Sequence, residues 1–138
     1  MIDPKIVFTN GCFDLIHSGH LSVLKRCEEI ATSAGLVYVG LNSDESVKRL
    51  KGENRPIRSQ EERKEILEAI RYVDYVIIFD EDTPIDLIKK IKPDVIVKGG
   101  DYEPRNVVGV ELVGEENIII VPTVGEKSTT NTIRRIKD

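Results

Sequence analysis

The two histidines of this chain, His17 and His20, lie three residues apart, between an apolar run and a segment with helical spacing. Gly19 stands between them and has no side chain that could block the approach of a ligand. At a helix N-terminus, where free backbone N–H groups attract anions, both imidazoles would project towards the same phosphate. Gly11 would let the backbone turn closely past that phosphate. This arrangement suits charge stabilisation in a displacement at phosphorus.

Two other interpretations of the histidine pair stay open on these residues alone. Both imidazoles could be surface side chains in a polar loop. They could also bind zinc, but the glutamate of a His-Glu-x-x-His helix is absent and no third ligand is evident. The position of the pair, directly after a predicted strand, favours the phosphate interpretation.

A basic cluster follows the second predicted strand and consists of Lys48, Arg49 and Lys51. Its charges could close over a triphosphate. A charge run of this kind is more commonly a solvated helix face, and the sequence does not decide which lysine would reach the α-phosphate.

Two later segments combine small or hydroxyl residues with ligand-binding potential. Residues 98–102 contain two glycines that allow close approach, and Asp101 and Tyr102 could contact a sugar or base; the alternative is a plain glycine turn. Residues 128–130 (Ser-Thr-Thr) precede Ile133 and Ile136, which have helical spacing. That placement would direct hydroxyls and free N–H groups at a helix start towards phosphate oxygens.

These candidate residues need a scaffold, and five short β-branched runs predict one. The runs cover residues 5–9, 36–41, 75–79, 95–98 and 118–121. Each has the apolar character of a strand that is buried on both faces.

Segments with helical spacing separate these runs. The first has an apolar stripe that consists of Leu21, Leu24, Cys27, Ile30 and Ala31. The second begins at Ser59, where Glu62 stands three residues after a cap candidate. Its expected buried face consists of Ile66, Leu67 and Ile70.

A third helix is expected from Thr83 as cap and Pro84 as its first residue, and it should stop before Pro93. Alternating strands and helices imply right-handed crossovers and a parallel sheet. We therefore predict a Rossmann-like, doubly wound α/β fold with five strands and helices on both faces, in one domain over residues 1–138. Ligands of such folds bind at the carboxyl ends of the strands.

Composition narrows the class of protein further. A 40% hydrophobic and 32% charged chain of 138 residues is typical of a globular domain with a heavily charged surface. No apolar run is long enough to span a bilayer, and the first predicted strand leaves no room for a signal peptide, so we expect a cytoplasmic protein without membrane contact. The net charge of −4 argues against nucleic-acid binding. Two cysteines are too few for a disulfide framework.

The motifs together resemble the His-x-Gly-His nucleotidyltransferases, a superfamily with a cytidylyltransferase branch. The likeness covers essentially the whole chain. Within the superfamily, the chain looks most like the heptose-1-phosphate adenylyltransferases of lipopolysaccharide-core synthesis. It rests on HSGH (17–20), NSDESVKRLKG (42–52), RPI (55–57), ER (62–63), KGGDY (98–102) and STTNT (128–132).

The resemblance implies in-line attack of an acceptor phosphate on the α-phosphorus of a nucleoside triphosphate, with release of pyrophosphate. It implies catalytic roles for His17, His20, Lys48 and Lys51. It implies nucleotide binding by Thr9, Asn10, Gly11, Cys12, Phe13, Gly19, His20, Lys98, Gly99, Asp101, Ser128, Thr129 and Thr130. It implies acceptor binding by Asp14, Arg63, Arg71 and Tyr102.

The resemblance further implies magnesium carried by the triphosphate, with no metal site in the protein itself, and a homodimer. No covalent enzyme intermediate is required. Cys12 is therefore interpreted as a small strand-end residue and not as a nucleophile. A surface salt bridge on an amphipathic helix is the alternative role for Arg71.

One segment departs from the cytidylyltransferase pattern. Glycerol-3-phosphate cytidylyltransferases carry Arg-Thr-Glu-Gly-Ile before Ser-Thr-Thr, whereas this chain has Thr-Val-Gly-Glu-Lys at 123–127. The expected substrates are ATP and D-glycero-D-manno-heptose 1-phosphate, giving ADP-heptose. The alternatives are a glycerol-3-phosphate cytidylyltransferase, an FMN adenylyltransferase, and a nucleotide-sensing module without turnover.

Overall fold

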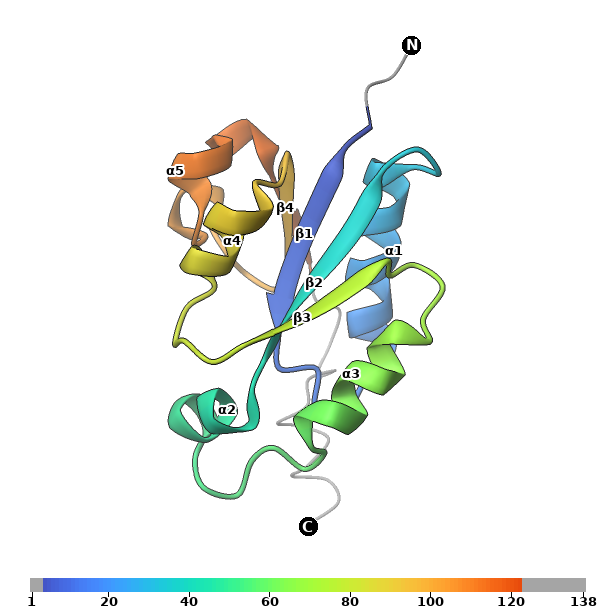
Figure 1. Cartoon of the computed structure of the whole chain (residues 1–138). Coiled ribbons are helices and arrows are strands. Elements are labelled where there is room, and N and C mark those ends of the chain that lie inside the picture. The colour runs from blue at the N-terminus through green and yellow to red at the C-terminus, as the bar shows by residue number, and fades with distance from the viewer. Residues whose placement is uncertain (1–3, 123–138) are drawn as a thin grey trace.

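The computed structural model describes residues 4–122 and contains a parallel sheet with the strand order β3-β2-β1-β4-β5 (Figure 1). The strands are β1 (Ile6–Gly11), β2 (Leu36–Asn42), β3 (Tyr75–Phe79), β4 (Val95–Gly99) and β5 (Ile118–Val121). All five predicted runs are therefore strands, and the predicted parallel sheet is confirmed.

Strand β1 lies in the middle of the sheet and pairs with β2 along its whole length, from Ile6 opposite Leu36 to Gly11 opposite Leu41. Its other neighbour, β4, pairs through Val7 and Phe8. The chain therefore goes from β1 to one side of the sheet and later returns to the other side. In doubly wound folds this reversal of direction marks the edge where ligands bind.

Five α-helices and two short 3₁₀ helices complete the described part of the chain. The α-helices are α1 (Ser18–Ala31), α2 (Asp44–Lys51), α3 (Gln60–Glu68), α4 (Ile85–Ile91) and α5 (Val110–Val113), and the 3₁₀ helices are η1 (Pro104–Asn106) and η2 (Glu115–Asn117). Helices α1 and α3 cover one face of the sheet, and α4 and α5 cover the other (Figure 1). Helices on both faces were predicted, and this is confirmed.

Alternate residues of each strand pack on opposite faces, as the two-residue period of a strand requires. On the α1 side, Val7 and Val97 are fully buried against Cys27. On the α4 side, Phe8 and Ile96 are fully buried and pack in one cluster with Ile88. The sheet is thus held between two apolar layers, which fixes the position of its polar carboxyl edge.

The first helix differs from the sequence-based expectation at one position. Leu24 and Cys27 are buried as predicted, but Leu21 is 41% exposed and Val23 is buried in its place. The stripe was counted every three residues, whereas a helix turns every 3.6 residues, so Leu21 rotates away from the sheet. Prediction of the buried face from a three-residue period was therefore wrong at the start of α1.

The starts of the other helices are closer to expectation. Ser59 caps α3, with its hydroxyl accepting a hydrogen bond from the Glu62 backbone N–H. Thr83 does not cap α4, because Pro84 is the N-cap residue and the helix begins one position later than predicted. Lys92, in a left-handed conformation, ends α4 before Pro93. Helix α2 was foreseen only as a charge run.

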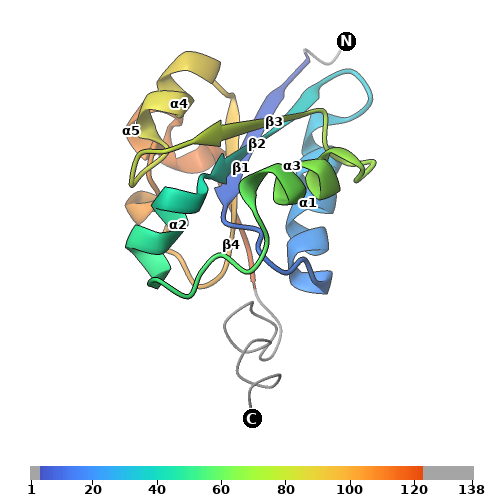
Figure 2. The same ribbon diagram turned by 60° about the horizontal axis from the view of Figure 1, so that its bottom comes forward.

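The carboxyl ends of the strands face the side of the molecule where α2 lies, and Figure 2 brings this side forward. The loop from β1 to α1 and the connection from α2 to α3 meet there (Figure 2). Residues 128–130 lie outside the described residues. Among residues 4–122, no helix combines the length and apolar character that a membrane crossing requires.

Candidate active site

A cavity of about 400 Å³ opens at the carboxyl edge of the sheet, between the start of α1 and the end of α2. Eleven of the predicted site residues line it, together with residues that the sequence did not single out. Its lining consists of Asn10, Gly11, Cys12, Phe13, His17, Gly19, His20, Val23, Asn42, Leu50, Lys51, Arg55, Asp82, Lys98, Gly99 and Tyr102. The predicted edge of the sheet is therefore also where the structure is hollow.

Both histidines belong to this cavity and lie close together. The centroids of the His17 and His20 rings are 4.1 Å apart, with the ring planes inclined by 34°. The Phe13 ring packs against His20, at 5.3 Å between centroids. The rings therefore do not point apart and are not locked in the core, which are the arrangements that would have ruled out a shared phosphate.

The start of α1 fixes the orientation of both imidazoles through the backbone. His17 is the N-cap residue, and its Nδ1 accepts a hydrogen bond from the Gly19 N–H at 3.0 Å. His20 reaches back, and its Nδ1 accepts from the His17 N–H at 3.2 Å. The pair thus forms a capping box, with imidazoles in the place of the usual hydroxyl and carboxylate.

These two bonds determine which ring nitrogen carries the proton. A nitrogen that accepts an N–H bond must be unprotonated, so each ring holds its proton on Nε2. Each imidazole is then a neutral ring with an Nε2–H donor. Such donors can stabilise negative charge on phosphate oxygens without a proton transfer.

The surroundings of His20 keep it neutral. Burial, together with the nearby His17 and Lys51, lowers its pKa to about 4. At neutral pH the ring is therefore uncharged, in agreement with its role as an acceptor at Nδ1 and a donor at Nε2.

The two lysines of α2 occupy different places. Lys51 lines the cavity and is close enough to affect the His20 pKa. Lys48 is not among the lining residues, and its Nζ lies 3.6 Å from Glu45 of the same helix. Of the two predicted catalytic lysines, the structure brings only Lys51 together with the histidines.

Two residues predicted to bind the acceptor are buried inside the protein. Asp14 is 1% exposed and accepts hydrogen bonds from the backbone N–H groups of Ile57 and Arg58 and from Arg55 Nε. These contacts hold the α2–α3 connection against the β1–α1 loop. In this arrangement Asp14 positions the site, and direct contact with an acceptor would require these bonds to open.

Arg63 is fully buried, and each of its three guanidinium nitrogens donates inside the protein. Its partners are the carbonyls of Arg58, Cys12 and Asn42 and the carboxylate of Asp44. The residue therefore joins α3 to the ends of β1 and β2 and to the start of α2. The sequence motif located an important arginine, but its geometry is that of an internal clamp.

Three other predicted residues lie away from the lining of this cavity. Arg71 is exposed and contacts Tyr72, with its guanidinium carbon 5.1 Å from the ring centroid. Asp101 is exposed and absent from the lining. Thr9 is 1% exposed and lines a smaller pocket of about 180 Å³ that also includes Cys12 and His20. Their assigned roles stay predictions, as do those of Ser128, Thr129 and Thr130.

Lys98 stands where this cavity meets a second one. Its Nζ donates to the carbonyl of Asn10 at 3.2 Å and lies 5.6 Å from the centroid of the Tyr102 ring. Burial lowers the Lys98 pKa. The amine is thus fixed at the end of β1 by groups from two strands and the following turn.

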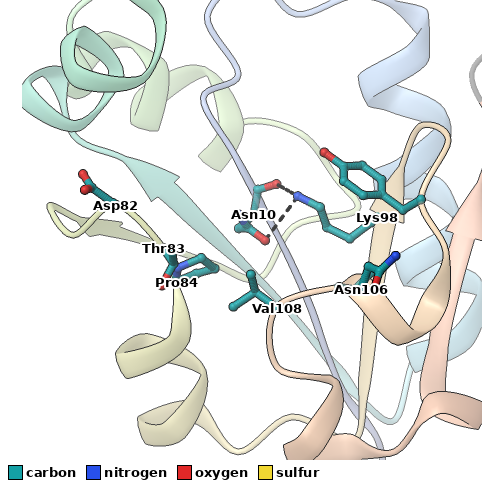
Figure 3. Close-up of a pocket in the computed structure, with 9 residues that line it drawn as sticks. Asn10, Asp82, Thr83, Pro84, Lys98, Asn106 and Val108 are labelled. Atoms are coloured by element: carbon teal, nitrogen blue, oxygen red, sulfur yellow. Dashed lines mark hydrogen bonds between the residues drawn. The ribbon is translucent and has the colours of Figure 1, made fainter.

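The second cavity has a volume of about 200 Å³ and lies on the α4 side of β1 (Figure 3). Asp82, Thr83 and Pro84 enter it from the β3–α4 connection, and Asn106 and Val108 enter from the segment after β4 (Figure 3). It shares Asn10, Asp82, Lys98 and Tyr102 with the first cavity. The two cavities therefore adjoin at these shared residues.

The glycines and Cys12 have structural reasons for their positions. A Cβ on Gly11 would lie 3.2 Å from the Phe13 ring, and a Cβ on Gly99 would lie 2.7 Å from Val23 of α1. Both glycines thus permit close packing at the site. Burial raises the pKa of the Cys12 thiol, and its carbonyl is held by Arg63. A raised pKa argues against a nucleophilic thiolate.

Sequence reasoning missed Arg55 and the walls of the second cavity. Arg55 belongs to the RPI motif, but the motif does not indicate what its side chain contacts, and nothing local in the sequence marks Asn106 or Val108 as pocket residues. Their positions follow from tertiary contacts between segments that are far apart in the chain. Within residues 4–122, no group of three His, Cys, Asp or Glu side chains is arranged to hold a metal ion.

Comparison with known proteins gives the family of this site. The model of the family described as cytidylyltransferase-like matches residues 8–135, which is most of the chain. The chain belongs to the cytidylyltransferase-like family. It is accordingly a nucleotidyltransferase domain, and the histidine-lined cavity is its candidate active site.

Two curated relatives of this cytidylyltransferase-like chain are both named "Bifunctional protein HldE". The protein from Campylobacter concisus is 57% identical over 134 residues, which are 97% of this chain and 27% of the relative. The protein from Aliarcobacter butzleri is 54% identical over 137 residues, which are 99% of this chain and 28% of the relative. This chain therefore spans about a quarter of the length of the curated relatives it matches.

A solved structure extends the likeness to three dimensions. The lipopolysaccharide core biosynthesis protein from Thermoplasma volcanium has a TM-score of 0.66 and 25% identity, over 87% of this chain and 96% of that protein. Its agreement supports the Rossmann-like α/β fold. Nucleotidyltransferases of this family generally use a divalent metal and act on small-molecule substrates.

Proposed function

We propose that this nucleotidyltransferase transfers the adenylyl group of ATP to D-glycero-D-manno-heptose 1-phosphate, forming ADP-heptose and pyrophosphate. The proposal is supported by the motif resemblance, by the HldE relatives and by the neighbour described as a lipopolysaccharide core biosynthesis protein. The observation that carries the chemistry is the capping box of two imidazoles, which presents neutral donors at a cavity of suitable size.

In the proposed reaction an oxygen of the sugar phosphate attacks the α-phosphorus in line, and pyrophosphate leaves. The P–O bond to the acceptor forms as the bond to the β-phosphate oxygen breaks. Nε2–H groups of His17 and His20 donate to the phosphate oxygens as negative charge accumulates, and Lys51, which lines the same cavity, adds a positive charge. No residue needs to become covalently attached.

The second cavity is the proposed place of the sugar. Its polar side chains, from Asp82, Thr83 and Asn106, suit the hydroxyl groups of a polyol, while Val108 and Pro84 offer apolar contact. Because it adjoins the phosphate cavity at Asn10 and Lys98, a sugar there could hold its phosphate next to the histidines.

Magnesium fits this site as a companion of the triphosphate. Mg²⁺ is commonly bound through substrate phosphates, water and at most one or two carboxylates. Asp82 is the carboxylate among the lining residues of the cavity, and Arg49 is paired with it at 2.9 Å. When bound, the ion would neutralise charge on the phosphates. A homodimer and a cytoplasmic location complete the proposal.

A pyrophosphate-release screen tests the function. ATP, CTP, GTP and UTP are each combined with heptose 1-phosphate, glycerol 3-phosphate and FMN. We expect the rate of pyrophosphate release with ATP and heptose 1-phosphate to be at least tenfold higher than with every other pair. Activity with CTP and glycerol 3-phosphate, or with ATP and FMN, would replace the substrate assignment. Nucleotide binding without release in any pair would favour a sensing module.

A further inference from the structure

A buried arginine on the α2–α3 connection has a buried nitrogen that the described residues do not use. Arg55 is 9% exposed and lines the same cavity as His17, His20 and Lys51. Its Nε donates to Asp14 Oδ2 at 3.1 Å. Its Nη2 is buried and has no hydrogen-bond acceptor among residues 4–122.

A buried cationic donor without an acceptor destabilises the folded state, because it has lost its hydrogen bonds to water and no protein hydrogen bond replaces them. Arg63 provides a comparison within the same molecule. That arginine is also buried, and every one of its guanidinium nitrogens has a protein acceptor. The protein thus supplies acceptors to the arginine that is not itself a lining residue, and it leaves a buried nitrogen of the lining arginine without one.

The pairing with Asp14 does not account for the free nitrogen. Asp14 already accepts from the backbone of Ile57 and Arg58, so the connection would be anchored without Arg55. The Nε contact instead fixes the direction of the guanidinium group, which leaves its far side for another acceptor. Arginine is well suited to this purpose, because its planar fork can bind a carboxylate and a phosphate at once.

The charges of the cavity indicate what that acceptor is. Lys51, Arg55 and Lys98 are cationic, and Asp82 is the carboxylate among the lining residues. A group that enters between them must therefore be an anion with oxygen acceptors.

We propose that Arg55 binds a phosphate oxygen of one of the two substrates through Nη2, with Asp14 as the residue that positions its guanidinium group. This rests on the proposed function for the identity of those substrates. It adds a direct substrate contact that the sequence motifs did not assign, and it makes the α2–α3 connection part of the binding site.

The test uses Arg55→Lys, which keeps a positive charge near Asp14 but removes the planar fork, and Arg55→Gln, which removes the charge. Arg58→Gln is the matched control, since it lies in the same connection and its side chain is not part of the cavity lining. Dissociation constants for ATP and for heptose 1-phosphate are measured separately by calorimetry. Thermal unfolding without ligand shows whether each variant is folded.

We expect folded Arg55→Lys to weaken the binding of at least one ligand about tenfold or more, which corresponds to about 1.4 kcal/mol, and Arg55→Gln to weaken it further. The weakened ligand identifies which substrate supplies the phosphate. Arg58→Gln should change neither constant by more than about twofold. Unchanged constants for both ligands in folded Arg55→Lys would overturn the proposal.

Failure of the proposed function gives a different result. If the wild-type protein binds ATP but releases no pyrophosphate with any acceptor, the reaction assignment fails, while weaker ATP binding by Arg55→Lys would still support the arginine contact. If the Arg55 variants unfold, inorganic pyrophosphate is titrated into wild-type protein and the Arg55 side-chain Nε resonance is followed by NMR. A shift of this resonance supports the contact, and no shift at saturation contradicts it.

Discussion

His20 is the residue whose chemistry the structure defines most fully. Its Nδ1 is occupied by a backbone N–H, its ring is neutral, and it lines the cavity beside Lys51. We expect His20→Ala to lower kcat by about 100-fold or more, because loss of one donor to a developing charge commonly has an effect of this size. Steady-state pyrophosphate release measures it.

Cys12→Ala is the matched control for His20→Ala. It changes a neighbouring lining residue whose raised pKa disfavours a thiolate, so kcat should stay within about threefold of the wild-type value. Loss of activity in Cys12→Ala would contradict the non-covalent mechanism. Retention of full activity by His20→Ala would remove the catalytic role of the imidazole.

The proton on His20 can be observed directly, because the chain has only two histidines. Burial lowers the His20 pKa to about 4, so imidazole ¹⁵N NMR should show a neutral ring with Nε2 protonated down to about pH 5. In urea the same resonance should titrate near the ordinary value of about 6.5. A folded-state titration near 6.5 would contradict the buried, neutral ring.

The same shift links His20 to stability. An unfolded chain takes up the proton at about pH 6.5, whereas the folded chain resists it until about pH 4. The contribution of His20 to the free energy of unfolding is therefore present above pH 6.5 and is lost between 6.5 and 4. Below about pH 4, where His20 is protonated in both the folded and the unfolded chain, this contribution does not decrease further.

At the scale of elements, α2 separates two lysines that the sequence could not rank. One turn of helix places Lys51 at the cavity and Lys48 beside Glu45. We expect Lys51→Ala to lower kcat/KM by about 10-fold to 100-fold, as the loss of a charge-assisted contact does.

Lys48→Ala is the corresponding control on the same helix and should change kcat/KM by less than about threefold, since a surface pair with Glu45 contributes little. The reverse order of the two effects would show that Lys48 moves into the site when nucleotide binds. Competition assays with ATP distinguish weaker binding from slower chemistry.

The strands were predictable because runs of β-branched residues strongly favour strands. The boundaries and buried faces of the helices were harder to predict. Leu21 is exposed because a three-residue count drifts from the true turn of a helix, and Thr83 loses the cap position because Pro84 occupies it. Helix α2 was hidden in a charge run, since its buried side is limited to Ser46 and Val47.

At the scale of the whole molecule, Arg63 connects four parts of the fold by side-chain donors. Arg63→Ala would leave the carbonyls of Cys12 and Asn42 unpaired and remove the partner of Asp44. We expect the free energy of unfolding to decrease by about 3 kcal/mol, as measured by urea denaturation.

Arg71→Ala provides the comparison, because Arg71 is exposed and contacts only its neighbour Tyr72 among the described partners. It should change the free energy of unfolding by no more than about 0.5 kcal/mol. Equal effects of the two substitutions would contradict the clamp role of Arg63.

The candidate site was predictable in part. His17, His20 and the end of β1 were located because a helix start after a central strand has a fixed relation to the sheet. Arg63 was found, but its burial was not, because an arginine motif does not reveal whether the side chain turns inward. Asn106 and Val108 could not be found, since the pocket they line forms only when the segment after β4 packs beside the β3–α4 connection.

The two adjoining cavities are built from different connections of the chain. The groups that we expect to face phosphate come from the β1–α1 and α2–α3 connections, whereas Asn106 and Val108 come from the segment after β4. Substitutions near residues 106–108 can therefore alter which compound is accepted without disturbing the machinery that cleaves the triphosphate. If the proposed function holds, such a division makes this small domain a practical starting point for redirecting nucleotide-sugar synthesis towards unnatural products.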